Sequence, residues 1–407
     1  MRKINTRHFH VATRSTPREV NRQIVLNLIR EHQPISRAEL ARRMAVARGA
    51  LTTLVRDLVA SGVVYEEGTA AVVAGPGRRP TLLRLRTSGR LALAVDVRPS
   101  RTTLALADIG GRVVAKDVVA TPETPEALVD LIAVRGRRLI ATQAATGECQ
   151  GVGLVVPGMV DRHSGRVIYA PRLGWRNVEL RDALAARLEL PVYVESAPIA
   201  CALSRLWLSP EETRGVHSFA YVSVSDGVGV GLVINGEPLR GDAHTAGEFG
   251  HVSLDPNGPS CVCGKRGCWE AMVCNAATVA RYVAAADSAG LTRAAAGRAI
   301  AVEEVVRRAA RGDRAAVAAL IDTGQAIGRG LAAVVSAFNP GRIYVGGEVT
   351  AAWEILERPM RVALAEGTLT AAGHGTPIVP DASQAEYRLL GAVALVAAPT
   401  FAAPSLG

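Results

Sequence analysis

Four of the six cysteines lie within 14 residues, and a histidine stands ten positions before the first of them. Thiol groups at this density are typical of a metal site in an intracellular chain, where disulfides are rare. One histidine and three cysteines complete a closed tetrahedral shell, which stabilises a loop because no position remains for water. The expected ligands are His251, Cys261, Cys263 and Cys268. Cys274 is a spare thiol, and the alternative is a chance group of reduced cysteines.

A second group of functional side chains is expected on a helix over residues 47–60. Leucine and valine recur there at helical spacing, which predicts one buried face. The opposite face carries small and basic residues: Arg48, Thr52, Thr53 and Arg56. Before this helix, Ser36 and Glu39 form the capping-box pattern that begins a short helix ending near Met44. Two short helices with a tight link, the second exposing Arg and Thr, are typical of a helix-turn-helix that reads the major groove of DNA.

Flanking elements extend this pair of helices to a winged helix. An amphipathic helix is expected over 18–32, and two strands are expected at 63–65 and 82–85. A basic tip lies between the strands, in which Arg78 and Arg79 can contact phosphates or the minor groove. The alternative for these elements is a helical interaction or dimerisation module.

The distribution of charge favours the DNA-binding interpretation. The chain has a formal net charge of +10. Residues 1–90 contain 17 Lys and Arg against 6 Asp and Glu, whereas the remaining residues contain 30 against 31. All of the positive excess therefore lies in the N-terminal module, as expected for a part that contacts a polyanion and is joined to a nearly neutral body. A solvated basic tail is the alternative.

Length and composition exclude several other classes of protein. A chain of 407 residues is long enough for two or three domains of about 150 residues each. Apolar residues make up 49% and charged residues 21%, and no apolar run reaches the length of a membrane span, so neither disorder nor a membrane protein is expected. The first residues lack the apolar segment of a secretory signal, which predicts a cytoplasmic location.

Strands and helices alternate from residue 91 onward, which predicts an α/β body. Three strands joined by glycine and proline turns are expected within 91–120. A hairpin is expected over 219–238, helices are expected over 276–336, and a final buried strand is expected at 342–347.

Five segments of the body form a recognisable pattern. They are VPGMVD at 156–161, APRLGWRNVEL at 170–180, GVGVGLVINGEPLRG at 227–241, AGEFGHVSLDPNGPSCVCGKRGCWE at 246–270 and FNPGRIYVGG at 338–347. This pattern resembles the ROK family, which comprises repressors, open reading frames and sugar kinases. The resemblance implies an actin-like, two-lobed sugar-kinase body that is dimeric or tetrameric and holds a sugar between its lobes. With an N-terminal winged helix, it implies a repressor of operator DNA.

The resemblance also implies the domain limits and the roles of several residues. The winged helix-turn-helix covers 1–88, a smaller α/β lobe covers 89–195 and is completed by 385–407, and a larger α/β lobe covers 196–384. In that family a zinc loop shapes the sugar site, so the metal is expected to be zinc. The implied sugar contacts are Ser196, Glu248, His251 and Glu270. Carboxylates and imidazole suit a polyol because they form charge-assisted hydrogen bonds with hydroxyls. The alternative for the two glutamates is support of the zinc ligands.

Three departures from the family's kinases fall on the residues of phosphoryl transfer. The D-x-G-G-T phosphate loop keeps Asp96 but has Pro99 in place of a glycine, which removes a backbone donor. Ala197 replaces the catalytic aspartate of the V-E-N-D-A-N motif, and Glu195 stands two residues earlier. Asp226 occupies the second glycine loop, where the kinases favour threonine.

We therefore expect a sugar sensor that has no catalytic residue. The alternative is a sugar kinase with an attached DNA-binding domain. Arg172 stands where the kinases usually carry asparagine, which leaves the identity of the sugar open.

Overall fold

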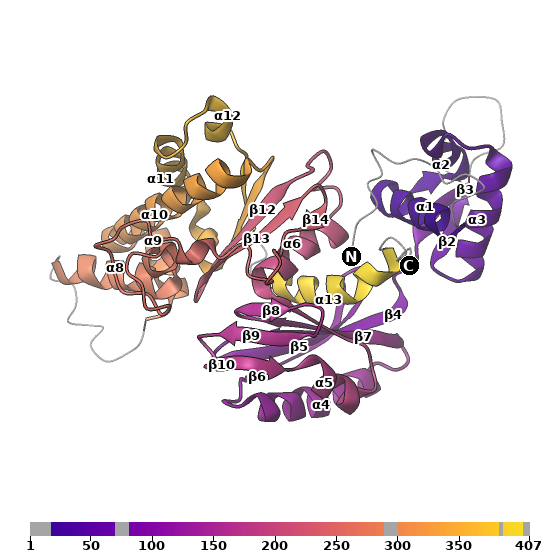
Figure 1. Ribbon diagram of the computed structural model, residues 1–407, viewed down its shortest axis with the longest axis horizontal. Coiled ribbons are helices and arrows are strands. Elements are labelled where there is room, and N and C mark those ends of the chain that lie inside the picture. The colour runs from indigo at the N-terminus through magenta and orange to yellow at the C-terminus, as the bar shows by residue number, and fades with distance from the viewer. Residues whose placement is uncertain (1–17, 70–80, 289–299, 382–385, 402–407) are drawn as a thin grey trace.

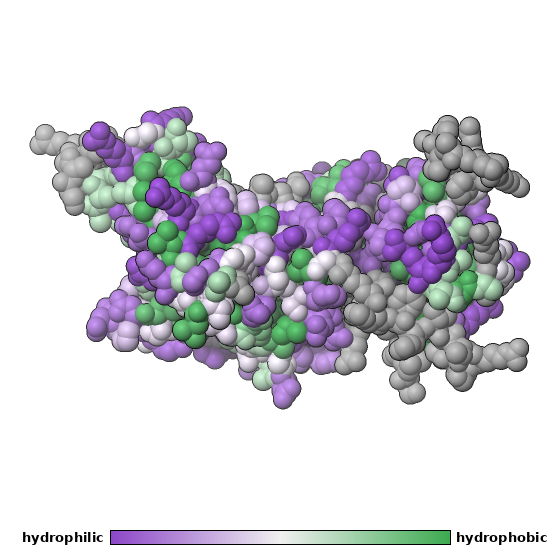
Figure 2. Space-filling model, turned by 90° about the horizontal axis from the view of Figure 1, so that it is seen from above, coloured by the Kyte–Doolittle hydropathy of each residue, from purple (hydrophilic) through white to green (hydrophobic). Residues whose placement is uncertain are grey.

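The computed structural model describes residues 18–69, 81–288, 300–381 and 386–401 of the chain. It contains an N-terminal winged helix and a body of two α/β lobes, which confirms the predicted fold class (Figure 1). The C-terminal helix lies against the smaller lobe and ends beside the winged helix (Figure 1). Hydrophilic and apolar residues are interspersed over the face shown in Figure 2. Within the described residues, no helix has both the length and the apolar character needed to cross a membrane.

The winged helix consists of three helices and a sheet with the strand order β1-β3-β2. Its elements are α1 (Arg18–His32), β1 (Ile35–Ser36), α2 (Arg37–Met44), α3 (Arg48–Ala60), β2 (Val64–Thr69) and β3 (Thr81–Leu85). The Ser36 hydroxyl accepts a hydrogen bond from the backbone N–H of Glu39 at 3.2 Å, which confirms the predicted cap of α2. Ala45 adopts a left-handed conformation that ends α2 and permits the tight link to α3.

The smaller lobe is built on a five-stranded sheet with the order β11-β7-β4-β5-β6. Its elements are β4 (Gly89–Val97), β5 (Arg101–Asp108), β6 (Val113–Ala120), α4 (Pro125–Thr142), β7 (Gly147–Val156), α5 (Arg181–Leu188) and β11 (Val192–Ser196). A separate three-stranded sheet contains β8 (Met159–Asp161), β9 (Arg166–Ala170) and β10 (Trp175–Glu179). Along β4, Leu91 and Leu93 pack with α4, whereas Ala92 and Ala94 pack with the C-terminal helix α13 (Glu386–Phe401). The alternation of strand residues therefore places small side chains beneath α13.

The larger lobe repeats this plan with the strand order β14-β13-β12-β15-β16. Its strands are β12 (Phe219–Val224), β13 (Val228–Ile234), β14 (Glu237–Pro238), β15 (Ile343–Gly346) and β16 (Ile378–Pro380). Its helices are α6 (Ala197–Leu208), η1 (Phe249–His251), α7 (Trp269–Val273), α8 (Asn275–Ser288), α9 (Val302–Ala310), α10 (Arg314–Phe338), η3 (Glu348–Ala352), α11 (Trp353–Glu366) and α12 (Ala371–His374). Helix α6 contacts β12 and β13 of this sheet and also α13 of the smaller lobe.

The prediction that the strand near 342–347 is the last one is wrong. Strand β16 follows it and pairs with it in parallel, with Ile343 opposite Ile378. This strand has three residues and ends in Pro380, so it shows neither the alternation nor the length on which strand prediction depends.

Candidate functional site

A cleft of about 300 Å³ lies between the two lobes. The smaller lobe lines it with the turn after β7 and the segment before β10. The larger lobe lines it with the turn between β12 and β13, the cysteine loop and the first turn of α6. The four residues expected to contact a sugar all line this cleft: Ser196, Glu248, His251 and Glu270. The structure thus brings together side chains from the end of β11, from η1 with its N-cap residue, and from α7.

Glu270 is fixed in the cleft by two hydrogen bonds. Its Oε2 atom accepts from the backbone N–H of Val228 at 3.0 Å, and its Oε1 atom accepts from Arg172 at 3.3 Å. A Cβ atom at Gly227 would lie 2.6 Å from Oε2 of Glu270, so the first bond requires glycine in the turn before β13. The second glycine loop therefore positions a carboxylate in this protein.

Glu248 is a second carboxyl group in the same cleft. Burial, together with the neighbouring charge of Glu270, raises the pKa of Glu248 to about 7. A carboxyl group with this pKa exists in both protonation states near neutral pH, so it can donate as well as accept a hydrogen bond. Such a group suits a ligand whose hydroxyls are both donors and acceptors.

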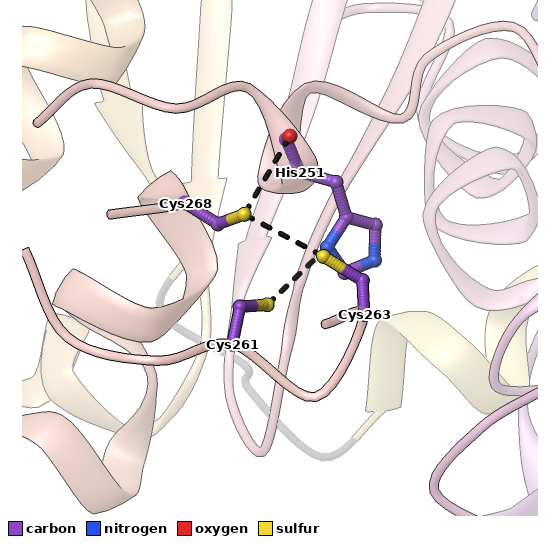
Figure 3. A group of neighbouring side chains, drawn as sticks. All are labelled: His251, Cys261, Cys263 and Cys268. Atoms are coloured by element: carbon purple, nitrogen blue, oxygen red, sulfur yellow. Dashed lines mark hydrogen bonds between the residues drawn. The ribbon is translucent and has the colours of Figure 1, made fainter. Parts of the chain in front are cut away.

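The four predicted metal ligands converge on one point beside the cleft (Figure 3). Their ligand atoms all lie within 4.8 Å of one another. The Sγ atom of Cys261 lies 3.6 Å from Nδ1 of His251, and Sγ of Cys263 lies 3.6 Å from Sγ of Cys268. The ligands of a tetrahedral ion with bonds of about 2.0 to 2.3 Å are separated by similar distances. Cys274 does not belong to this group of four candidate ligands.

The cysteine loop, residues 251–268, is also one wall of the cleft. Cys263 and Lys265 line the cavity, and Nζ of Lys265 donates to the backbone oxygen of His251 at 2.7 Å. His251 turns its Nδ1 atom toward the cysteines, while its Nε2 atom lies 4.0 Å from Glu248. The same imidazole can therefore bind a metal on one side and face a cleft carboxyl group on the other.

The positions that the family's kinases use for phosphoryl transfer lie in or beside the cleft. Ala197 lines the cleft at the start of α6. Glu195 is buried, and it accepts hydrogen bonds from Arg240 at 2.7 Å and from the backbone N–H of Ser196 at 3.0 Å. Asp96 is likewise held between Arg98 and Arg388, with N–O distances of 3.1 and 2.6 Å. Both carboxylates are therefore paired with arginine side chains of the protein.

Pairs of charged or polar side chains join the two lobes. Among the described residues they include Arg98 with Glu348 at 2.9 Å, Arg172 with Glu270 at 3.3 Å, Arg240 with Glu195 at 2.7 Å, and His244 with Asp161 at 3.2 Å. Sequence reasoning did not predict that any of these arginines bonds to the other lobe. Arg98 stands in the phosphate loop, and Arg172 and Arg240 stand in segments of the family pattern, so their positions were the available signal.

The expected DNA-contacting residues of α3 lie as the helical pattern predicts. Leu51, Val55 and Leu58 are buried, whereas Thr52 and Arg56 are exposed. Thr53 is half-buried, and Arg48 is the first residue of the helix. The wing residues Arg78 and Arg79 lie outside the described residues.

Comparison with known protein families matches the winged helix and the body of the chain to two different families. Residues 20–65 match a family described as "Winged helix-turn-helix DNA-binding", and residues 92–398 match the ROK family. The xylose repressor of Caldicellulosiruptor bescii is 26% identical, over 93% of this chain and 96% of its own length. The DNA-binding transcriptional dual regulator NagC of Escherichia coli K12 is also 26% identical, over 93% of this chain and 92% of its own length.

Solved structures resemble the protein to different extents. A ROK family transcriptional regulator, described as a homologue of the E. coli MLC protein, has a TM-score of 0.79 and 25% identity, and the match covers 94% of this chain and 96% of that one. A ROK family glucokinase from Streptomyces griseus, in complex with glucose and AMPPNP, has a TM-score of 0.66 and 27% identity, over 75% of this chain and 98% of its own. Because the family match spans both lobes, the protein belongs to the ROK family and carries an N-terminal winged helix-turn-helix.

Proposed function

We propose that this protein is a transcriptional repressor that binds operator DNA through its winged helix and responds to a sugar bound between its lobes. The extent of the similarity carries this proposal. The repressor and regulator relatives match across 93% of the chain, which includes the winged helix, whereas the glucokinase matches 75%. The cleft supports the sugar assignment because it offers polyol-binding groups on Ser196, Glu248, His251 and Glu270.

The proposal includes an assembly and a location. Helix-turn-helix proteins bind two half-sites about 34 Å apart as dimers, so we propose a homodimer or homotetramer in the cytoplasm, where the DNA is. The units of each chain would be the winged helix over 1–88, a smaller lobe over 89–195 with 385–407, and a larger lobe over 196–384. No membrane partner is proposed.

The Cys3His group would hold a zinc ion. Three thiolates and one imidazole at tetrahedral separations are the donor set that Zn²⁺ prefers in closed, structural sites. The bound ion would supply cohesion to the cysteine loop and no catalysis, because four protein ligands leave no open position. The loop in turn contains His251 and is flanked by Glu248 and Glu270, and all three residues line the cleft.

Purified protein should contain about one zinc per chain by plasma mass spectrometry. Cys261→Ser should lose most of that zinc and melt at a lower temperature, because a three-ligand site binds the ion more weakly. Cys274→Ser is the matched control and should keep the metal. A wild type without zinc, or a Cys261→Ser variant with full zinc and unchanged stability, contradicts this assignment.

The body would bind sugar without phosphorylating it. Ala197 offers no base, and Arg98 and Pro99 occupy the first phosphate loop. The competing proposal, a sugar kinase with an attached DNA-binding domain, rests on the kinase-like fold of the two lobes.

Incubation with ATP and a panel of monosaccharides should give no sugar-dependent phosphorylation above the rate without protein. The variant Ala197→Asp should remain inactive, because Pro99 and the ion pair of Arg98 with Glu348 are unchanged. Sustained ATP-dependent phosphorylation by the wild type would favour the kinase alternative.

The proposed DNA contacts come from two places. Arg48, Thr52, Thr53 and Arg56 would face the major groove, and Arg78 and Arg79 would contact phosphates or the minor groove. Replacing Arg78 and Arg79 by alanine should weaken binding across DNA sequences and lower the salt slope by about one unit per lost phosphate contact. Arg135→Ala, on the exposed face of α4 in the body, is the control. Wild-type affinity and salt dependence in the double variant would remove the wing from the interface.

The link between the two ligands is the central test. A thermal-shift screen with D-xylose, D-glucose and N-acetyl-D-glucosamine would identify a ligand, which at 100 times its Kd adds about 2.7 kcal/mol of stability. Operator DNA should then weaken the binding of that sugar by about 5 to 150-fold, a coupling of about 1 to 3 kcal/mol. Glu248→Ala should lose sugar affinity and keep DNA binding. Equal sugar affinity with and without DNA contradicts the proposal, and tighter sugar binding on DNA would make the sugar a co-repressor.

A further inference from the structure

Helices α6 and α13 lie where the two lobes meet, and both begin at the cleft. The first residues of α6 line the cavity, and a Cβ atom at Gly231 would lie 2.2 Å from the backbone oxygen of Pro198, so α6 is pressed onto the sheet of the larger lobe. At the start of α13, Arg388 donates to Asp96 at 2.6 Å and to the backbone oxygen of Val97 at 2.9 Å. Each helix therefore moves with one lobe.

The two helices touch each other through small residues. A Cβ atom at Gly391 of α13 would lie 2.5 Å from the backbone oxygen of Ala200 of α6. On its other side α13 lies equally close to β7, because a Cβ atom at Gly153 would meet the backbone oxygen of Ala392 at 1.9 Å. At Gly391 and Ala200 the backbones of α6 and α13 are thus separated by no large side chain, and a close approach of this kind suits the shear type of domain motion when the lobe angle changes.

The winged helix is docked where the C-terminal ends of α6 and α13 meet. Residues 23–30 of α1 are all buried, and their apolar members share one hydrophobic cluster with Trp207 of α6 and Phe401 of α13. The rings of Trp207 and Phe401 stack with their centroids 6.0 Å apart, where α13 comes close to the winged helix (Figure 1). Helix α1 thus contacts one helix from each lobe.

Arg30 makes the polar part of this contact. Its side chain is 3% exposed, and its NH1 group donates to the backbone oxygens of Leu206 at 3.1 Å and Trp207 at 3.3 Å. Carbonyls in the last turn of a helix have no partner within it, so this guanidinium caps α6. The same group lies 4.8 Å above the ring of Trp207 and 5.7 Å from that of Phe401. Burial lowers the pKa of Arg30 to about 10, which leaves the group charged at neutral pH.

A neighbouring residue makes the matching bond to the other helix. Asn27, one turn before Arg30 on α1, donates through Nδ2 to the backbone oxygen of Phe401 at 2.8 Å. One turn of α1 is therefore bonded to the ends of both interlobe helices. Any sliding of α6 along α13 must tilt α1 or break one of these bonds.

We propose that Arg30 is the positioning residue that makes the winged helix follow the angle between the lobes. This inference rests on the proposed control of DNA binding by a sugar. Closure of the cleft displaces the first turns of α6 and α13 relative to each other, and the capped end of α6 carries α1 with it. Residues 86–88 connect β3 of the winged helix to β4 of the smaller lobe. This connection alone cannot transmit a movement of the larger lobe to the winged helix.

The test measures the coupling factor, defined as the Kd of the sugar with DNA divided by the Kd without DNA. The DNA is a duplex that the wild type selects from a random library, and the sugar is D-xylose, D-glucose or N-acetyl-D-glucosamine, whichever gives the largest thermal shift. Arg30→Met keeps the length of the side chain and removes the helix cap. We expect its coupling factor to fall from the wild-type range of about 5 to 150 to below about 2, with zinc content and sugar affinity without DNA unchanged.

Arg22→Met is the matched control on the same helix. The Arg22 side chain pairs with Glu19 within α1, so its loss can change DNA affinity but should leave the coupling factor at the wild-type value. Full coupling in a folded Arg30→Met variant overturns the inference and leaves the proposed function intact. A wild type with a coupling factor of one is a different result, because it contradicts the proposed function before any variant is made, and the inference with it.

A second measurement on the wild type covers the case in which Arg30→Met does not fold. Hydrogen exchange with and without the sugar should show changed protection in α1 and in the last turn of α6. The outer helices α10 and α11, which do not contact the winged helix, serve as the internal reference. Unchanged exchange in both α1 and the end of α6, in protein saturated with sugar, would also overturn the inference.

Discussion

The contact between α6 and α13 joins the two lobes through backbone atoms, because glycine at 391 removes the side chain that would stand between them. Backbone contact sets the distance between the helices near their first turns, whereas the stacked rings of Trp207 and Phe401 join their last turns. The cleft lies at one end of this pair and the winged helix at the other. Overpacking costs typically about 1 to 3 kcal/mol, so a larger residue at 391 would disturb the cleft, the lobe angle and the seat of the winged helix together.

The ion pairs across the cleft differ in how strongly they resist opening. Arg98 is 10% exposed and Glu348 13%, so removal of either partner would leave a charge that is largely shielded from water. Arg172 is 28% exposed, and its bond to Glu270 is the long one at 3.3 Å. Glu270 itself is only 9% exposed, so a ligand that displaces Arg172 has to satisfy this buried carboxylate in its place. The two pairs therefore differ in the cation, which is buried beside the phosphate loop and reaches solvent at the proposed sugar site.

Sequence pattern predicted those parts of the fold that depend on interactions between residues close together in the sequence. The cap at Ser36, the buried face of α3 and the convergence of the cysteine loop all follow from residues a few positions apart. The arginine network did not, since Arg388 stands 292 positions from Asp96, and no periodicity links them. Arg30 reads as a polar position of an amphipathic helix, and its burial depends on the carbonyls of α6, 176 positions away. Hydrogen bonds and ion pairs between residues far apart in the sequence therefore could not be predicted from local sequence pattern.

The network around Arg98 explains how a kinase-like body can close without kinase chemistry. Phosphoryl transfer needs backbone donors and cations aimed at a phosphate, together with a free carboxylate to take the hydroxyl proton. Here Arg98 bonds to Asp96 in its own lobe and to Glu348 in the other, so one guanidinium group pairs with a carboxylate from each lobe. This attraction between the lobes comes from the chain itself. A sugar shifts the lobe angle to the extent that its affinity differs between the open and the closed cleft.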